Sequence, residues 1–296
     1  MTEIRHKNHT LLGILAATAV YAIYGLNVVF CKDLTAGNFI SPTVLFTLRT
    51  GGAALLFWAL SLFLPKERLS AKELGLTVLA SILCVILPQY STLIGVTMST
   101  PYDASLVSTV KPVLTMTLAF LLGKEKFSPR LLVGVLLTFL GAFILVIRPS
   151  RTFSTSLPGL LVLLVNGISF SFYLVLFKEF VSRHKIVTMM RWMFLFAFLV
   201  SLPIAMPSIP DARFSAFDGV VIWEILFLIV FATFLSHFLM PIGQRNLTST
   251  QYSLFIYVQC IVAAIVGYFM GLESLDWQKL AATLLFIAGV AVVRRA

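Results

Sequence analysis

The sequence predicts an all-α integral membrane protein with ten transmembrane helices. The chain of 296 residues is 59% hydrophobic and 11% charged, with a mean hydropathy of +0.99. Soluble domains contain roughly 45–50% apolar and about 25% charged residues, so a soluble protein is excluded. The apolar residues lie in blocks of roughly 20, the length with which a helix crosses a bilayer. Blocks such as 131–147 do not alternate in polarity, which excludes a membrane β-barrel.

Clusters of polar residues, proline and glycine separate the apolar blocks. The ten predicted spans are 11–32, 42–64, 73–97, 102–122, 129–148, 157–179, 186–206, 219–243, 249–270 and 277–294. Arg5 and Lys7 precede the first block, but this block exceeds the apolar core of a signal peptide, so we interpret it as a retained helix. Ser128 and Pro129 supply an N-cap and a first-position proline for the fifth span, and Asp276 caps the tenth.

The lysines and arginines predict the orientation. Fourteen of the 22 lie in the loops on the N-terminal side, five lie on the opposite side, and Arg49, Lys111 and Arg191 lie within spans. Because positively charged loops remain in the cytoplasm, we expect both termini there and a multi-pass protein of the inner (plasma) membrane. Arg191 lies near the cytoplasmic edge, and we expect its side chain to reach the lipid headgroups.

The chain repeats itself at half its length. A shift of 148 residues superimposes the block 123–128 on the block 271–276. The same shift pairs Gly95 with Gly243, Gln89 with His237, Lys111 with Gln259 and Pro112 with Cys260. Since five spans per copy is an odd number, the second copy must be inverted in the membrane. We therefore predict two inverted five-helix repeats, 1–148 and 149–296.

Several of these segments resemble a known family. The stretch 104–114, followed by Gly123-Lys-Glu125, Gly134 and Leu140-Gly141-Ala142, resembles the EamA domain of the drug/metabolite transporter superfamily. Ser41-Pro42 followed by Arg49 is similar to the opening of that domain's second span. The resemblance covers the whole chain as two domains. It implies ten helices, a central cavity and alternating access, usually for the export of small metabolites such as amino acids.

Lys111 is the first candidate substrate-binding residue. It lies about ten residues into its span, hence about 15 Å deep at roughly 1.5 Å per residue. Burying its ammonium costs at least ~2.5 kcal/mol unless the group is hydrated or paired. We predict that Lys111 faces a water-filled cavity and binds a carboxylate or another anionic group; the alternative is a structural lysine. Gln259 lies at a similar depth, and the two could together hold a zwitterion. Cys260 replaces Pro112, so we expect no helix break there.

Other polar residues complete the candidate site. Gln89 and His237 could line opposite vestibules or make an interhelical hydrogen bond, and His237 could contribute to proton coupling. Arg49 either binds substrate or braces the fold. Glu125 and its repeat mate Glu273 follow helix-ending glycines, and we expect them to be structural.

Aromatic residues could supply a wall for an apolar part of the substrate. Tyr24 and Asn27 lie three residues apart on one helical face, as do Phe170 and Tyr173 in the matching span. Tyr90 and Tyr257 could extend this wall, although aromatic residues at helical spacing often serve packing alone.

The sequence also excludes several mechanisms. Its predicted spans contain no central Asp or Glu, which disfavours proton-coupled export of cationic drugs. We find no P-loop, catalytic motif or metal-ligand spacing, so we expect no enzyme, no cofactor and no metal site. The positive charge falls in membrane-flanking loops, and nucleic acid is not an expected partner.

We therefore expect a secondary-active or facilitative transporter that exports amino acids or related carboxylates by alternating access. Two alternatives stay open: an importer or exchanger of an anionic metabolite, such as a phosphate ester or nucleotide-like compound, and a membrane protein that acts on lipids. The expected partners are the small-molecule substrate and membrane lipids. Coupling to protons, and a monomeric or homodimeric state, stay open.

Overall fold

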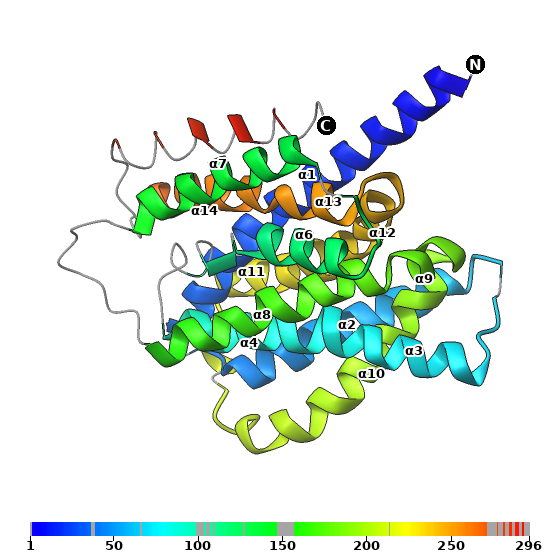
Figure 1. The fold of residues 1–296 in the computed structure, drawn as a ribbon. Coiled ribbons are helices and arrows are strands. Elements are labelled where there is room, and N and C mark those ends of the chain that lie inside the picture. Colours follow the sequence, from blue (N-terminus) through cyan, green and yellow to red (C-terminus); the bar gives the residue numbers. More distant parts are fainter. Residues whose placement is uncertain are drawn as a thin grey trace.

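All regular secondary-structure elements in the described part of the chain are helices in the computed structural model (Figure 1). The structure describes residues 2–36, 39–65, 67–98, 104, 107–108, 110–126, 128–146, 157–212 and 214–270, and further on 277, 281, 284–285, 288–289 and 292. The helices are α1 (Thr2–Ala36), α2 (Pro42–Ser61), α3 (Ala71–Ser81), η1 (Ile82–Ile86), α4 (Leu87–Thr97), α6 (Lys111–Leu121), α7 (Pro129–Val146), α8 (Leu157–Leu176), α9 (Lys178–Arg183), α10 (Ile186–Ala205), η2 (Met206–Ser208), η3 (Phe214–Ala216), α11 (Gly219–Ile229), η4 (Val230–Leu235), α12 (Ser236–Asn246), α13 (Ser249–Leu254) and α14 (Ile256–Phe269).

The described helices follow the predicted spans closely. Among the described residues, six segments are long and apolar enough to cross a membrane: His9–Thr35, Pro42–Ser61, Ala71–Thr97, Ile186–Ser208, Gly219–Asn246 and Ser249–Phe269. Of the fourth predicted span, the structure describes a continuous helix only from Lys111 onward. Most of the tenth predicted span, and Asp276, lie outside the described residues. The count of ten spans and the side on which the termini lie therefore stay predictions.

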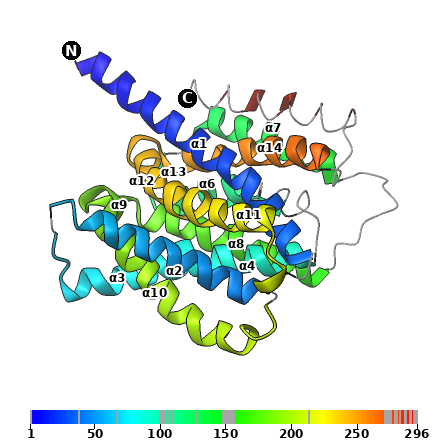
Figure 2. The same ribbon diagram turned by 180° about the vertical axis from the view of Figure 1, so that it is seen from behind.

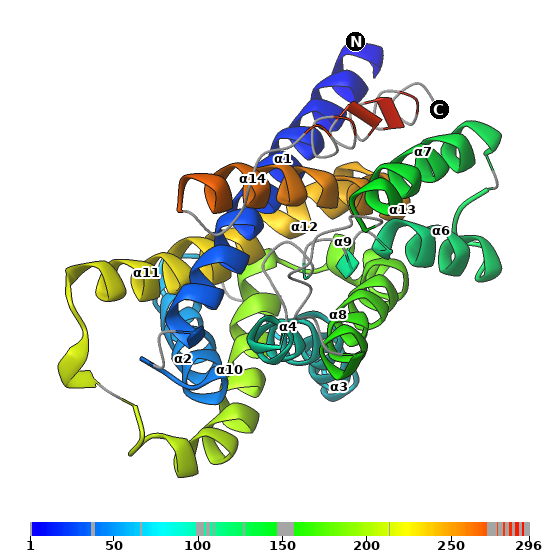
Figure 3. The same cartoon turned by 90° about the vertical axis from the view of Figure 1, so that its left-hand side faces the viewer.

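The first helix of each predicted repeat packs against the other repeat. α1 packs mainly on α12 and α14, whereas α8 packs mainly on α4 and α6. Figure 2 shows α1 lying against α12 and α14, and Figure 3 shows α4 between α8 on one side and the pair α2 and α10 on the other. The matching helices α2 and α10 pack on each other. This reciprocal arrangement is what two interlocked copies of one unit would produce.

Two π-helical segments interrupt the long helices at equivalent positions. η1 begins at Ile82 and η4 at Val230, which is the same shift of 148 residues that relates the two halves of the sequence. In the second segment, the Thr233 hydroxyl donates to the Leu228 carbonyl at 2.6 Å and the Ser236 hydroxyl donates to the Phe231 carbonyl at 3.0 Å. Such wide turns occur frequently at functional sites. Each lies shortly before a predicted site residue, Gln89 or His237.

Helix ends follow the local sequence. α7 begins at Pro129, as predicted. Gly123, at the end of α6, has a φ of +63°, a left-handed conformation that favours glycine. α14 continues through Cys260, so the helix break that Pro112 suggested for the first copy is lacking here, as expected. The second copy is interrupted earlier, at Phe255 between α13 and α14.

Glu125 stabilises the start of a helix distant in sequence. Its Oε1 accepts hydrogen bonds from the backbone N–H groups of Ser249 at 2.7 Å and Thr250 at 3.3 Å, at the first turn of α13. The sequence predicts a structural role for Glu125, and the structure identifies α13 as its partner. Because a carboxylate stabilises a helix N-terminus, Glu125→Gln should lower the free energy of unfolding by about 1 kcal/mol. Thermal unfolding in detergent measures this, and an unchanged midpoint would contradict the role.

Candidate functional site

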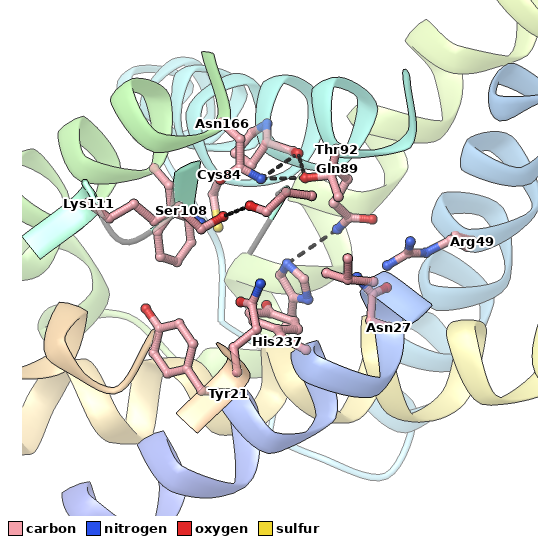
Figure 4. A pocket seen from close by; sticks show the side chains of 16 residues that line it. Tyr21, Asn27, Arg49, Cys84, Gln89, Thr92, Ser108, Lys111, Asn166 and His237 are labelled. Carbon is pink, nitrogen blue, oxygen red and sulfur yellow. Dashed lines mark hydrogen bonds between the residues drawn. The ribbon is translucent and has the colours of Figure 1, made fainter. Parts of the chain in front are cut away.

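A polar cavity lies in the interior of the helix bundle, and side chains from both predicted repeats line it (Figure 4). Seven of the ten predicted site residues lie on its wall: Tyr24, Asn27, Arg49, Gln89, Lys111, His237 and Gln259. They come from α1, α2, α4, α6, α12 and α14. The cavity has a volume of about 60 Å³, enough for a few water molecules. Ligand pockets commonly measure roughly 300–1,000 Å³, so a metabolite requires a wider conformation.

Lys111 is the first residue of α6 and is buried, with 6% of its surface exposed. Within the described part of the chain, its ammonium makes no hydrogen bond or ion pair; its Nζ lies 5.2 Å from the centre of the Phe170 ring. The following Pro112 lacks an N–H group. This costs nothing at a helix start, because the first N–H groups of a helix have no partner within the helix. A helix N-terminus also carries partial positive charge. This end of the cavity therefore favours an anion.

Arg49 lies at the opposite end of the cavity from Lys111 (Figure 4). Only 2% of its surface is exposed. Its Nε donates to the Thr233 hydroxyl at 3.0 Å and its Nη1 donates to the Cys31 sulfur at 3.4 Å. These bonds connect α2 with η4 and α1, which fits the bracing role considered from the sequence. Among the described residues of the wall there is no Asp or Glu, so the two cations face no protein counter-ion there.

Gln89 and His237 meet across the cavity. The His237 Nδ1 lies 2.7 Å from the Thr233 carbonyl oxygen, which can only accept, so Nδ1 carries a hydrogen. In the neutral ring Nε2 then accepts from the Gln89 amide, at 3.4 Å between the nitrogens. Of the two interpretations drawn from the sequence, opposite vestibules and an interhelical hydrogen bond, the structure contains the hydrogen bond. It joins the two predicted repeats at equivalent positions.

Asn166 in α8 lines the cavity and is not among the residues predicted from the sequence. Its Nδ2 donates to the Pro88 carbonyl at 2.9 Å and to the Thr92 hydroxyl, whereas its Oδ1 is buried without a partner in the described chain. The Gln89 Oε1 is likewise buried and unpaired among the described residues. An amide in the middle of an apolar span is costly in lipid, and that signal could have identified Asn166. Further residues missed on the wall are Tyr21, Cys84, Thr92 and Ser108.

Three predicted tyrosines do not line the cavity. Tyr90 packs against Phe46, with ring centres 5.6 Å apart, and Tyr257 is buried in the apolar core. The Tyr173 hydroxyl donates to the Gln244 Oε1 at 3.4 Å, and its ring stacks on Phe177. The predicted aromatic wall therefore lacks these residues, because their helix faces turn toward packed neighbours.

Comparison with known proteins gives matches along most of the chain. The model of the EamA-like transporter family matches residues 11–147 and 157–295. A protein of Archaeoglobus fulgidus described as an uncharacterized transporter is 24% identical over 259 residues, which cover 87% of this chain and 90% of the relative. A second uncharacterized transporter of that organism is 23% identical over 169 residues, covering 56% of this chain and 58% of the relative. A solved structure described only as a crystal structure of a protein has a TM-score of 0.72 at 17% identity, covers 98% of both chains and shares the fold.

Proposed function

Because the chain belongs to the EamA-like transporter family, as its residues had suggested, we propose that it exports amino acids or related carboxylates across the inner membrane by alternating access. Family membership and the apolar helices identify a multi-pass membrane transporter. What we propose beyond this is the substrate class, the direction of transport and the transport mechanism.

The Lys111 ammonium carries the proposal. It is buried at the cavity wall and has no hydrogen-bond or ion-pair partner in the described chain. An unpaired buried cation is costly, and a substrate carboxylate would supply the missing charge with a charge-assisted hydrogen bond. The N-terminal end of α6 would add to this attraction.

Neutral oxygen atoms would hold the ammonium of an amino acid. The Gln89 Oε1 and the Asn166 Oδ1 belong to residues on the cavity wall and lack donors among the described residues. An ammonium offers three N–H donors and would satisfy such acceptors. Gln259, also on the wall, would contribute its amide.

Alternating access would arise from two inverted halves, 1–148 and 149–296, that move relative to each other about the cavity. The equivalent π-helical segments and the reciprocal packing of α1 and α8 support this division. The bond between Gln89 and His237 connects the halves in the present conformation, and the small volume requires the halves to separate when substrate binds.

A second candidate substrate is an anionic metabolite such as a phosphate ester or a nucleotide-like compound, imported or exchanged. Lys111 and Arg49 at opposite ends of the cavity, without an acid on the described wall, favour this class. A ligand with two negative charges could contact both cations.

Counterflow into liposomes tests the proposal. We expect vesicles containing purified protein and an unlabelled amino acid or carboxylate to accumulate the labelled compound without chemical conversion. Counterflow limited to phosphate esters would instead support the second candidate. If correctly folded protein shows no counterflow of amino acids, carboxylates or phosphate esters, both candidate functions are wrong. A pH-sensitive dye inside the vesicles reports whether protons accompany the solute.

A further inference from the structure

An apolar groove runs along the outer surface between α2 and α10. It has a volume of about 490 Å³ and is lined mainly by apolar side chains, including Leu48, Leu55, Phe198 and Leu202. Leu55 is 74% exposed, and Gly51 lets α2 approach Phe198 closely, because a Cβ there would come within 2.9 Å of the Phe198 ring. In a membrane protein, hydrocarbon is the solvent that covers such a surface.

A basic pocket lies at the end of this groove where α2 ends and α10 begins. It has a volume of about 320 Å³, and three cations, Lys185, Arg191 and Arg245, line it. Lys185 Nζ donates to the Pro65 carbonyl at 3.2 Å, and Arg245 Nε donates to the Val181 carbonyl at 3.0 Å. Carbonyl groups are neutral, so these bonds do not neutralise the positive charges, and of the two nearby acids only Glu67 acts electrostatically on Arg245.

The acidic groups near the pocket, Glu67 and Glu73, contact His184, and Glu67 also acts electrostatically on Arg245. Glu67 accepts hydrogen bonds from the His184 ring at 3.1 Å and from the Lys185 backbone N–H at 2.8 Å. Glu73 lies 3.6 Å from the other ring nitrogen of His184. Neither carboxylate lines the pocket, whose described wall therefore has a net positive charge.

A cluster of Trp58, Trp192 and Arg191 joins the groove to the basic pocket. The Arg191 guanidinium lies 4.9 Å from the Trp58 ring centre and 5.9 Å from that of Trp192. Trp58 lines the groove, whereas Arg191 lines the pocket. The Trp58 Nε1 and the Arg191 Nε have no acceptor in the described chain. Tryptophan is enriched at the depth where lipid headgroups meet hydrocarbon, and the long side chain of arginine can extend to that depth.

We infer that this surface binds one anionic glycerophospholipid, with its phosphate headgroup on Arg191, Lys185 and Arg245 and an acyl chain in the groove between α2 and α10. The charge of the pocket selects an anionic headgroup, and the adjoining groove selects a molecule with a hydrocarbon chain. The site shares no residue with the described wall of the central cavity, so it stands apart from the proposed transport function.

Thermal unfolding and native mass spectrometry of the full chain in a neutral detergent test this site. We expect phosphatidylglycerol to raise the unfolding midpoint and to remain bound as one molecule, whereas phosphatidylcholine with the same acyl chains does neither. Inorganic phosphate should also leave the midpoint unchanged. Arg191→Gln should weaken retention of phosphatidylglycerol at least tenfold. The matched control is Arg183→Gln, which removes an exposed arginine from α9 and should have no effect on retention.

Three results would overturn the inference. They are equal retention of phosphatidylcholine, a stabilisation that inorganic phosphate reproduces, and full retention of phosphatidylglycerol by the Arg191 variant. If Arg191→Gln does not fold, two further variants replace it: Lys185→Gln, which removes a headgroup charge, and Leu202→Trp, which fills the groove. Each should weaken retention several-fold, and normal retention by both would contradict the site.

Discussion

Replacing Lys111 with methionine should weaken binding of carboxylate substrates by about 10- to 100-fold, since a hydrogen bond to a charged group contributes roughly 1.5–3 kcal/mol. The same change should leave the protein at least as stable as the parent. The ammonium has no polar partner in the described chain, so its removal leaves no other group unpaired. The change also removes a charge that is buried away from water, which is costly. Counterflow rates and unfolding midpoints, measured on the same preparation, give the two readouts.

Two further variants calibrate this result. Lys124→Met removes an exposed lysine that is paired with Glu179 at 2.7 Å, and transport should be unaffected. Gln259→Leu removes a neutral amide from the cavity wall and should weaken binding by about tenfold or less, because a neutral hydrogen bond contributes roughly 0.5–1.5 kcal/mol. Normal transport by Lys111→Met would refute the site assignment. A variant that is folded only at low temperature would indicate a structural lysine.

Gly25→Ala should destabilise the protein by about 1–3 kcal/mol, the range found for overpacked cores. Gly25 lies on α1 where it crosses α14. An added Cβ would come within 2.6 Å of the Val262 Cβ and 2.9 Å of the Gln259 carbonyl oxygen. Both contacts are with rigid parts of α14, so the two helices must separate. Because Gln259 lines the cavity, substrate binding should weaken together with stability.

Gly75→Ala is the matched control, since nothing lies within 4 Å of the position of its Cβ. An exposed glycine within a helix costs about 1 kcal/mol relative to alanine, so this variant should be slightly more stable than the parent. Unfolding midpoints of the two variants in the same detergent measure the difference. Equal midpoints would show that the contact between α1 and α14 is looser than these distances indicate.

The sequence predicts the helices well because the bilayer imposes a length and an apolar composition on each span. It also predicts the polar residues of the cavity, since Lys111, Arg49 and Gln259 cannot face lipid and must turn inward. A tyrosine side chain is not restricted to the cavity in this way. Tyr173 and Tyr257 would have the same helical spacing whether they lay in a packed core or at a cavity wall. The spacing therefore does not predict which of the two they face.

Gln89 and His237 show a second limit of the sequence. Their equivalent positions in the repeat are evident from the sequence, but the sequence does not decide between opposite vestibules and a hydrogen bond between the two helices. The structure brings them into contact. Whether two equivalent residues meet depends on how near they lie to the axis that relates the copies, and that distance is set by the packing of helices far apart in the chain.

The two π-helical segments determine which side chains after them face inward. A π turn takes up about one residue more than an α turn, and each residue of an α-helix turns the chain by about 100°. Deleting one residue from Ile82–Ile86 would therefore rotate everything beyond it in that helix by more than a quarter of a revolution. Gln89 would then swing away from His237, and polar atoms now sheltered would be exposed to hydrocarbon.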